Sequence, residues 1–136
     1  MKRLTWEGLV LVFAVISSLA NGIIQPPAAS AQSGGDATRG RALYDGRCGA
    51  CHSLDVNRTG PRHRGVVGRR VASANGYDYS PALRQVGGVW TSDRLDAWLQ
   101  GPQRMAPGSR MYLTVPDTNQ RRDIIAYLAT TDGSER

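Results

Sequence analysis

The spacing of hydrophobic and polar positions predicts three helices, at about residues 36–46, 91–100 and 117–130. In each segment, small or apolar residues recur three or four positions apart and therefore share one helix face. These residues are Gly40 and Tyr44, then Leu95, Trp98 and Leu99, then Ile124, Tyr127 and Leu128. The N-cap candidates are Asp36, Thr91 or Ser92, and Asp117 or Thr118, and Gly101-Pro102 ends the second helix. An all-α domain at residues 36–131 is expected, with 132–136 as a C-terminal tail.

Residues 53–90 contain many turn formers and little periodicity. The turn signals include Gly60-Pro61, Asn75-Gly76, Ser80-Pro81 and Gly87-Gly88, and one helical turn is expected after Pro81. A stretch of loop this long is unusual inside a compact domain. It becomes reasonable if the loops wrap round a bound cofactor.

The first 31 residues have the features of a secretory signal peptide. Lys2 and Arg3 precede the uncharged run Leu9–Ala20, and the small-residue triplet Ala29-Ser30-Ala31 follows Pro26-Pro27. Cleavage after Ala31 is expected, with an uncleaved membrane anchor as the alternative, although the apolar stretch is short for a span. Residues 32–35 then form a flexible linker into the domain.

Charge narrows the classes of partner. Removing residues 1–31 takes Lys2, Arg3 and Glu7 from the 17 basic and 11 acidic side chains, which leaves 15 arginines, no lysine and 10 acids. The basic balance favours an acidic docking partner or an anionic surface. No nucleic-acid-binding motif is present, and the export signal argues against that class.

The segment Cys48-Gly49-Ala50-Cys51-His52 carries the strongest chemical signal. This C-x-x-C-H pattern is that of c-type haem attachment, in which each thiol adds to one vinyl group and the histidine reaches the iron. The alternatives are a zinc site or a thioredoxin-like site. Zinc needs further ligands, and only His63 is left. A thioredoxin-like site should follow a strand in a βαβ pattern, which the chain lacks.

The ligand opposite His52 decides the function, because a filled sixth position means electron transfer and an open one means gas or peroxide chemistry. Three side chains are candidates: His63, Met105 and Met111. His63 follows His52 closely and would have to cross to the other face of the ring, so a surface or loop role is expected. Met111 ends a turn-rich segment in which a methionine has little other purpose, and Met105 is the fallback.

In residues 34–129 the chain resembles the class I cytochromes c, which include mitochondrial cytochrome c and its bacterial relatives. The matching features come in order: the opening helix with Gly40 and Tyr44, the haem motif, Gly60-Pro61, Gly68-Arg69, Gly76-Tyr77-Asp78-Tyr79-Ser80, Trp90 and Pro107-Gly108-Ser109-Arg110-Met111. The resemblance implies the class I fold, with three main helices and loops wrapped round one covalent haem c. It also implies that the last helix crosses the first closely at Gly40.

The resemblance also implies a role for each site residue. Met111, in the segment that contains Ser109, would be the axial ligand opposite His52, and the Pro61 carbonyl would accept a hydrogen bond from His52. Arg69, Tyr79 and Trp90 would stabilise the haem propionates. Three positions depart from the family pattern: His63 stands in place of an apolar residue, Leu83 in place of an asparagine, and Trp98 in place of a tyrosine, although the Trp98 indole N–H can still donate.

These features predict a soluble, monomeric, periplasmic electron carrier rather than an enzyme. The resemblance implies that Arg47, Arg104 and Arg110 occupy the family's docking positions, with Arg39 and Arg41 nearby. There they would steer the protein toward acidic redox partners such as a bc1-type complex, an oxidase or a dehydrogenase. Membrane contact is expected only if the leader is retained. The alternatives are a cytochrome subunit dedicated to one periplasmic dehydrogenase or reductase, and a haem sensor or peroxidase with a displaceable Met111.

Overall fold

A computed structural model describes residues 34–132 of the 136-residue chain. The expected leader at 1–31, the first linker positions and residues 133–136 of the expected tail lie outside this range. Within residues 34–132, no helix combines the length and the apolar character that crossing a membrane requires.

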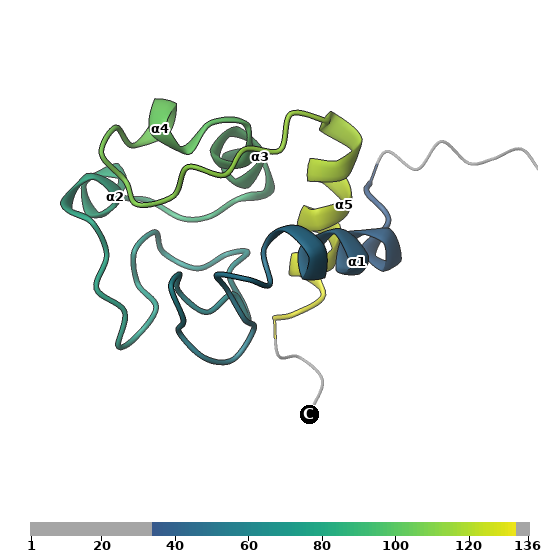
Figure 1. Cartoon of the computed structure of the whole chain (residues 1–136), viewed down its shortest axis with the longest axis horizontal. Helices are drawn as coiled ribbons and strands as arrows, with labels where there is room; N and C mark the ends of the chain where they lie inside the picture. Colours follow the sequence, from purple (N-terminus) through teal and green to yellow (C-terminus); the bar gives the residue numbers. More distant parts are fainter. Residues whose placement is uncertain (1–33, 133–136) are drawn as a thin grey trace, which may run out of the picture. The chain divides into compact units, whose positions relative to one another are not determined.

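The three expected helices are present as α1 (Ala37–Arg47), α3 (Ser92–Gln100) and α5 (Thr118–Ala129), and they account for the main helical mass in Figure 1. Each begins at an expected cap: the side chains of Asp36, Thr91 and Asp117 accept hydrogen bonds from backbone N–H groups of the first turn. The all-α class is confirmed.

Two short helices complete the described elements, α2 (Pro81–Val86) and α4 (Pro102–Met105). The first is the expected turn after Pro81, with Ser80 as its N-cap. The second was not expected, because Gly101-Pro102 indicates the end of a helix. Proline ends α3 and also starts α4, since its fixed φ suits the first position of a helix.

The closest helix contact joins α1 to α5, which cross in Figure 1. A Cβ added to Gly40 would overlap the Asp123 carbonyl oxygen and lie 2.9 Å from Cβ of Tyr127. Ile124, on the same face of α5, is only 1 % exposed. Glycine at position 40 therefore permits the two backbones to approach, which confirms the close crossing expected there.

We predict that Gly40→Ala lowers the free energy of unfolding by about 2–3 kcal/mol, because the new methyl group forces α1 away from α5. Gly46→Ala is the matched control in the same helix, since a Cβ there meets nothing within 4 Å. It should raise the stability by up to about 1 kcal/mol through helix propensity alone. Chemical denaturation of both variants measures the difference, and a stabilising Gly40→Ala would contradict the close crossing.

The segment between α1 and α2 is mostly loop, as expected, and it is tied by backbone hydrogen bonds rather than by a sheet (Figure 1). The N–H groups of His63 and Arg64 donate to the carbonyls of Ser53 and Leu54. A single antiparallel bridge joins Arg70 to Val89. These bonds hold the loop against the start of α3 and give the site residues fixed positions.

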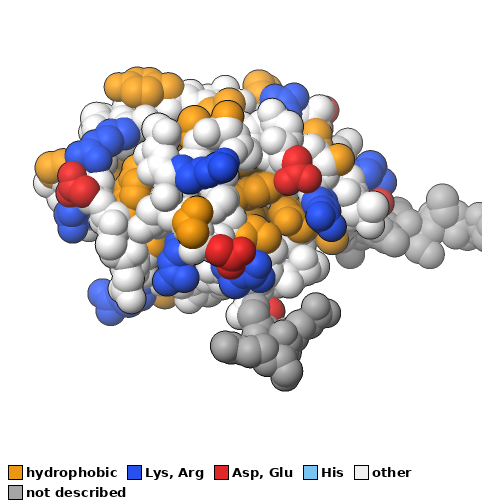
Figure 2. Space-filling view, turned by 60° about the horizontal axis from the view of Figure 1, so that its bottom comes forward, with side chains coloured by type: hydrophobic (Ala, Val, Ile, Leu, Met, Phe, Trp, Pro, Cys, Tyr) orange, Lys and Arg blue, Asp and Glu red, His pale blue; other side chains and the backbone are white. Residues whose placement is uncertain are grey.

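Basic side chains are spread over the surface and many are paired with acids. Figure 2 shows a face on which basic and acidic groups surround central apolar side chains. The ion pairs include Arg39 with Asp36 and Asp123, Arg64 with Asp55, Arg84 and Arg110 with Asp78, and Arg121 with Asp96. Five arginines of the described range are therefore paired with acids inside the fold, while the net positive charge stays the same.

Candidate functional site

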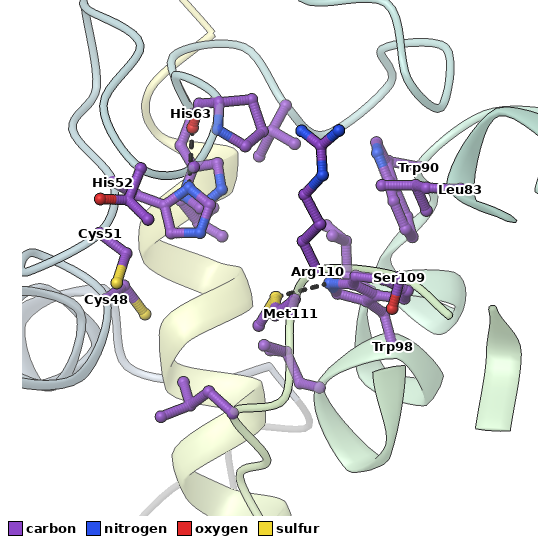
Figure 3. Close-up of a pocket in the computed structure, with 18 of the residues that line it drawn as sticks. Cys48, Cys51, His52, His63, Leu83, Trp90, Trp98, Ser109, Arg110 and Met111 are labelled. Carbon is purple, nitrogen blue, oxygen red and sulfur yellow. Dashed lines mark hydrogen bonds between the residues drawn. The ribbon is translucent and has the colours of Figure 1, made fainter. Parts of the chain in front are cut away.

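A cavity of about 310 Å³ lies among the helices and the long loop. Its walls come from the end of α1, the loop after it, α3, residues 109–113 and α5. In Figure 3, the two cysteines, His52 and His63 lie on one side, and Met111, Trp98, Trp90 and Leu83 lie on the other. Segments far apart in the sequence thus converge on one largely apolar space.

Cys48 and Cys51 lie in the turn that follows α1, and both thiols are free. Cys48 is buried and Cys51 is exposed. Burial raises the pKa of the Cys48 thiol to about 11, so this thiol is protonated at neutral pH. Both residues line the cavity, which puts two free thiols on one side of it (Figure 3).

His52 is held by the loop that follows it. Its Nδ1 lies 2.7 Å from the Pro61 carbonyl oxygen. A proton on Nδ1 can donate to that oxygen, which leaves Nε2 with a free lone pair for a metal. Burial lowers the pKa of His52, against a smaller opposite effect of the Pro61 hydrogen bond, so the ring is neutral at pH 7. A Cβ on Gly60 would overlap the imidazole, so glycine is needed beside it.

His63 lies in the loop after His52, which fits the expected surface or loop role, but its ring is half-buried. Its ring stacks on that of His52, with centroids 3.9 Å apart and an interplanar angle of 20°. Burial, together with the nearby His52 and Arg69, holds the pKa of His63 well below its ordinary value. Its backbone pairing with Ser53 brings the side chain inward. His63 is therefore a half-buried loop residue, and its side chain lies beside His52 rather than opposite to it (Figure 3).

Met105 and Met111 are both partly buried and pack against the hydrophobic core, but Met111 lines the cavity and Met105 does not. The Trp98 indole Nε1–H donates a hydrogen bond to the Met111 sulfur at 3.2 Å (Figure 3). Trp98, which replaces the usual tyrosine, therefore still donates a hydrogen bond on this side of the cavity. Leu83, the other departure on this side, contributes apolar surface to the wall.

The segment that carries Met111 is fixed by a residue that the sequence patterns did not reveal. The side-chain amide of Gln103 in α4 bonds to the backbone or side chain of Gly108, Ser109 and Met111. Ser109 is buried, with its hydroxyl group accepting from that amide. A glutamine after proline in a turn-rich stretch gives no periodic or motif signal.

The remaining candidate residues, Arg69, Tyr79 and Trp90, also line the cavity. The Tyr79 hydroxyl oxygen accepts from the Ala74 N–H at 3.1 Å, so its own proton can donate to another group. Arg69 donates to the carbonyls of Arg62 and Arg64. Trp90 is buried and its ring lies 5.5 Å from that of Trp98, centroid to centroid.

Three buried polar atoms at the cavity have no hydrogen-bond partner within the described part of the chain: Tyr44 Oη, His63 Nδ1 and Arg69 Nε. Buried polar groups are rarely left unsatisfied in a folded protein. A flat apolar group that carries anionic substituents would fill the apolar space and give Arg69 a partner. The residues present therefore fit a haem, whose attachment needs the two free thiols.

The comparison with known families gives the decisive observation: residues 37–132 match the family model for cytochrome c. The chain belongs to the cytochrome c family. Members bind haem c covalently, so the cofactor is one covalent haem c, and Cys48 and Cys51 are present in the spacing of the attachment motif. Cytochromes c transfer electrons between redox partners and are not enzymes, and this cytochrome is an electron-transfer protein.

Curated relatives support the assignment. The chain is 43 % identical over 100 residues to cytochrome c2 of Rhodopila globiformis. This alignment covers 71 % of this chain and 93 % of that protein. It is 40 % identical over 99 residues to cytochrome c of Euglena viridis, at 71 % and 97 % coverage. It is also 40 % identical over 98 residues to the c-type cytochrome cy of Rhodobacter capsulatus, of which it spans about half the length (49 %, against 71 % of this chain).

A solved structure agrees with this cytochrome's fold. Cytochrome cH from Methylobacterium extorquens superposes with a TM-score of 0.67 at 39 % sequence identity, covering 71 % of this chain and 99 % of that one. Together with the helices described above, this confirms the class I cytochrome c fold that the sequence resemblance implied.

Proposed function

We propose that this cytochrome is a periplasmic one-electron carrier whose haem iron is held by His52 on one face and Met111 on the other. The observation that carries the proposal is the placement of the two side chains on opposite sides of the cavity, each with its own hydrogen-bond partner (Figure 3). When bound, the haem supplies an iron that changes between the ferric and ferrous states by one electron.

The two ligands act in different ways. His52, neutral and held by Pro61, offers Nε2 as a nitrogen donor of fixed orientation. Met111 offers a soft, neutral thioether, which favours ferrous iron and raises the reduction potential relative to a second histidine. The hydrogen bond from Trp98 directs the sulfur and withdraws electron density from it. A filled sixth position leaves no place on the iron for a substrate.

Three further residues are assigned to the haem propionates. The unpartnered Nε of Arg69 supplies a buried positive donor, and the Tyr79 hydroxyl retains a proton to donate. Trp90 offers its indole N–H from the same wall. Carboxylates taken out of water need such donors, because an unpaired buried charge is costly.

Electron transfer occurs through the exposed edge of the site. Arg47 and Arg110 line the cavity there, and Tyr112 beside Met111 is 73 % exposed. Arg39 pairs with Asp36 and Asp123, and Arg110 pairs with Asp78, so each of these arginines adds less to docking than an unpaired one. We propose that this edge docks against an acidic surface of a bc1-type complex, an oxidase or a dehydrogenase. The leader at 1–31 is proposed to be cleaved on export, giving a soluble monomer.

Electron exchange with an inorganic complex tests this function. Ferricyanide, an anion, should oxidise the ferrous cytochrome rapidly, and the rate should fall as ionic strength rises because a positive edge steers the anion. A cationic cobalt complex of similar driving force is the control and should show the opposite salt dependence. A slow reaction with both reagents, or identical salt dependence, would contradict an exposed basic edge.

A further inference from the structure

Gln103 makes four hydrogen bonds to the segment that carries Met111. Its Nε2 lies 2.8 Å from the Ser109 carbonyl, 2.9 Å from the Ser109 hydroxyl and 2.8 Å from the Met111 carbonyl. Its Oε1 accepts from the Gly108 N–H at 3.1 Å. One side chain thus bonds to three of the last four residues of the segment 107–111.

The chemistry of the partners fixes the orientation of this amide. Both carbonyl oxygens can only accept, so they require the NH₂ group, and the Gly108 N–H can only donate, so it requires the oxygen. A glutamine amide provides both functions at one end of a flexible chain. Neither a lysine nor a glutamate at position 103 could satisfy all these partners, because each lacks either the acceptor or the donors.

Trp98 donates a hydrogen bond to the Met111 sulfur, but the backbone of the segment 107–111 has few restraints besides Gln103. Pro107, Gly108 and Arg110 are exposed, and Gly108 has a φ of +87°, a conformation suited to glycine. The Ser109 N–H donates to Ala106 at 2.9 Å. On the outer side, Arg110 pairs with Asp78, whose side chain is 79 % exposed. Exposed ion pairs contribute little to stability, so the half-buried Gln103 is the stronger restraint.

From these contacts we infer that Gln103 is a positioning residue for the axial ligand: its amide holds the backbone of residues 108–111 so that the Met111 thioether stays presented to the iron. The inference rests on the proposed ligation by Met111. None of the residues of α4 lines the cavity, so α4 would act on the site through the hold of Gln103 on the segment that carries Met111. Loss of the amide frees the segment and makes Met111 easier to displace.

Imidazole binding to the ferric holoprotein measures how easily Met111 is displaced. Gln103→Met keeps the length of the side chain and removes its hydrogen bonds, so imidazole should bind about 10- to 100-fold more tightly than to the wild type. Gln103→Glu keeps an acceptor for Gly108 but loses both donors, and should also bind imidazole more tightly. Gln100→Met is the matched control, because the exposed Gln100 side chain bonds to Asp96 within α3 and, among the described residues, not to the segment 107–111.

Amide hydrogen exchange at Gly108 provides a readout that does not depend on the iron. The Gly108 amide should exchange about tenfold faster in Gln103→Met, and near the wild-type rate in Gln103→Glu, which still accepts from it. A general loss of stability would instead speed exchange throughout the domain.

Unchanged imidazole affinity in both Gln103 variants would overturn the inference, provided that the wild type shows the far-red absorption band of methionine-ligated ferric haem. An equal rise in the Gln100→Met control would also overturn it. Absence of that band from the wild type would instead refute ligation by Met111, so the two failures are distinguishable.

Discussion

Replacing both cysteines, Cys48→Ser with Cys51→Ser, is expected to abolish covalent haem attachment completely. Hydroxyl groups do not add to the vinyl groups as thiols do, so neither thioether can form. Haem that enters the cavity is then held only by its ligands and by packing, and extraction with acidified acetone should remove it. The wild-type haem should stay with the polypeptide under the same treatment.

The physical consequence for the fold is also large. The domain is small, and its core residues line a cavity of about 310 Å³ that the haem would fill. A domain of this size has little apolar surface to spare, so release of the cofactor should cost much of the stability. Met111→Ala is the control that keeps both thioethers. Covalent haem in the double serine variant would contradict the assignment of Cys48 and Cys51 as the attachment site.

Truncation of the axial methionine, Met111→Ala, is expected to leave the haem attached and open the sixth coordination position. The far-red band should disappear, the reduced protein should bind carbon monoxide rapidly, and the reduction potential should fall because the thioether no longer favours ferrous iron. Trp98 would lose the acceptor for its indole N–H group. Absorption spectroscopy and a redox titration on the holoprotein measure these changes.

Met105→Ala is the matched control for this experiment. Met105 is partly buried against the core and does not line the cavity, so its loss should reduce stability by about 2 kcal/mol and leave the iron spectrum intact. If the far-red band persisted in Met111→Ala and disappeared in Met105→Ala, Met105 rather than Met111 would be the iron ligand. Retention in both would mean that neither is the ligand.

Much of the fold could be predicted because its signals are local. The caps at Asp36, Thr91 and Asp117 depend on neighbouring residues only, and the structure has the helices where these caps indicate. The attachment pattern is likewise contained in five consecutive residues. Gly40 is different, since its reason lies in α5, and only the family resemblance indicated the crossing.

The features that sequence analysis missed depend on contacts between distant segments. His63 is turned inward by backbone bonds to Ser53, and nothing in its immediate neighbours distinguishes it from an exposed loop histidine. Gln103 acts through a side chain that reaches five to eight residues ahead, across a turn whose shape the sequence does not specify. Helix α4 was missed because Gly101-Pro102 indicates the end of the preceding helix, although Pro102 also begins the next one.

The measurement that tests the central claim most directly is the visible spectrum of the matured protein in its ferric and ferrous forms, with the pyridine haemochrome alongside. We predict a low-spin, six-coordinate spectrum with the weak far-red band of methionine bound to ferric iron, and a haemochrome typical of two thioethers. A high-spin spectrum, or one typical of two histidine ligands, would contradict ligation by His52 and Met111 and with it the proposed electron carrier.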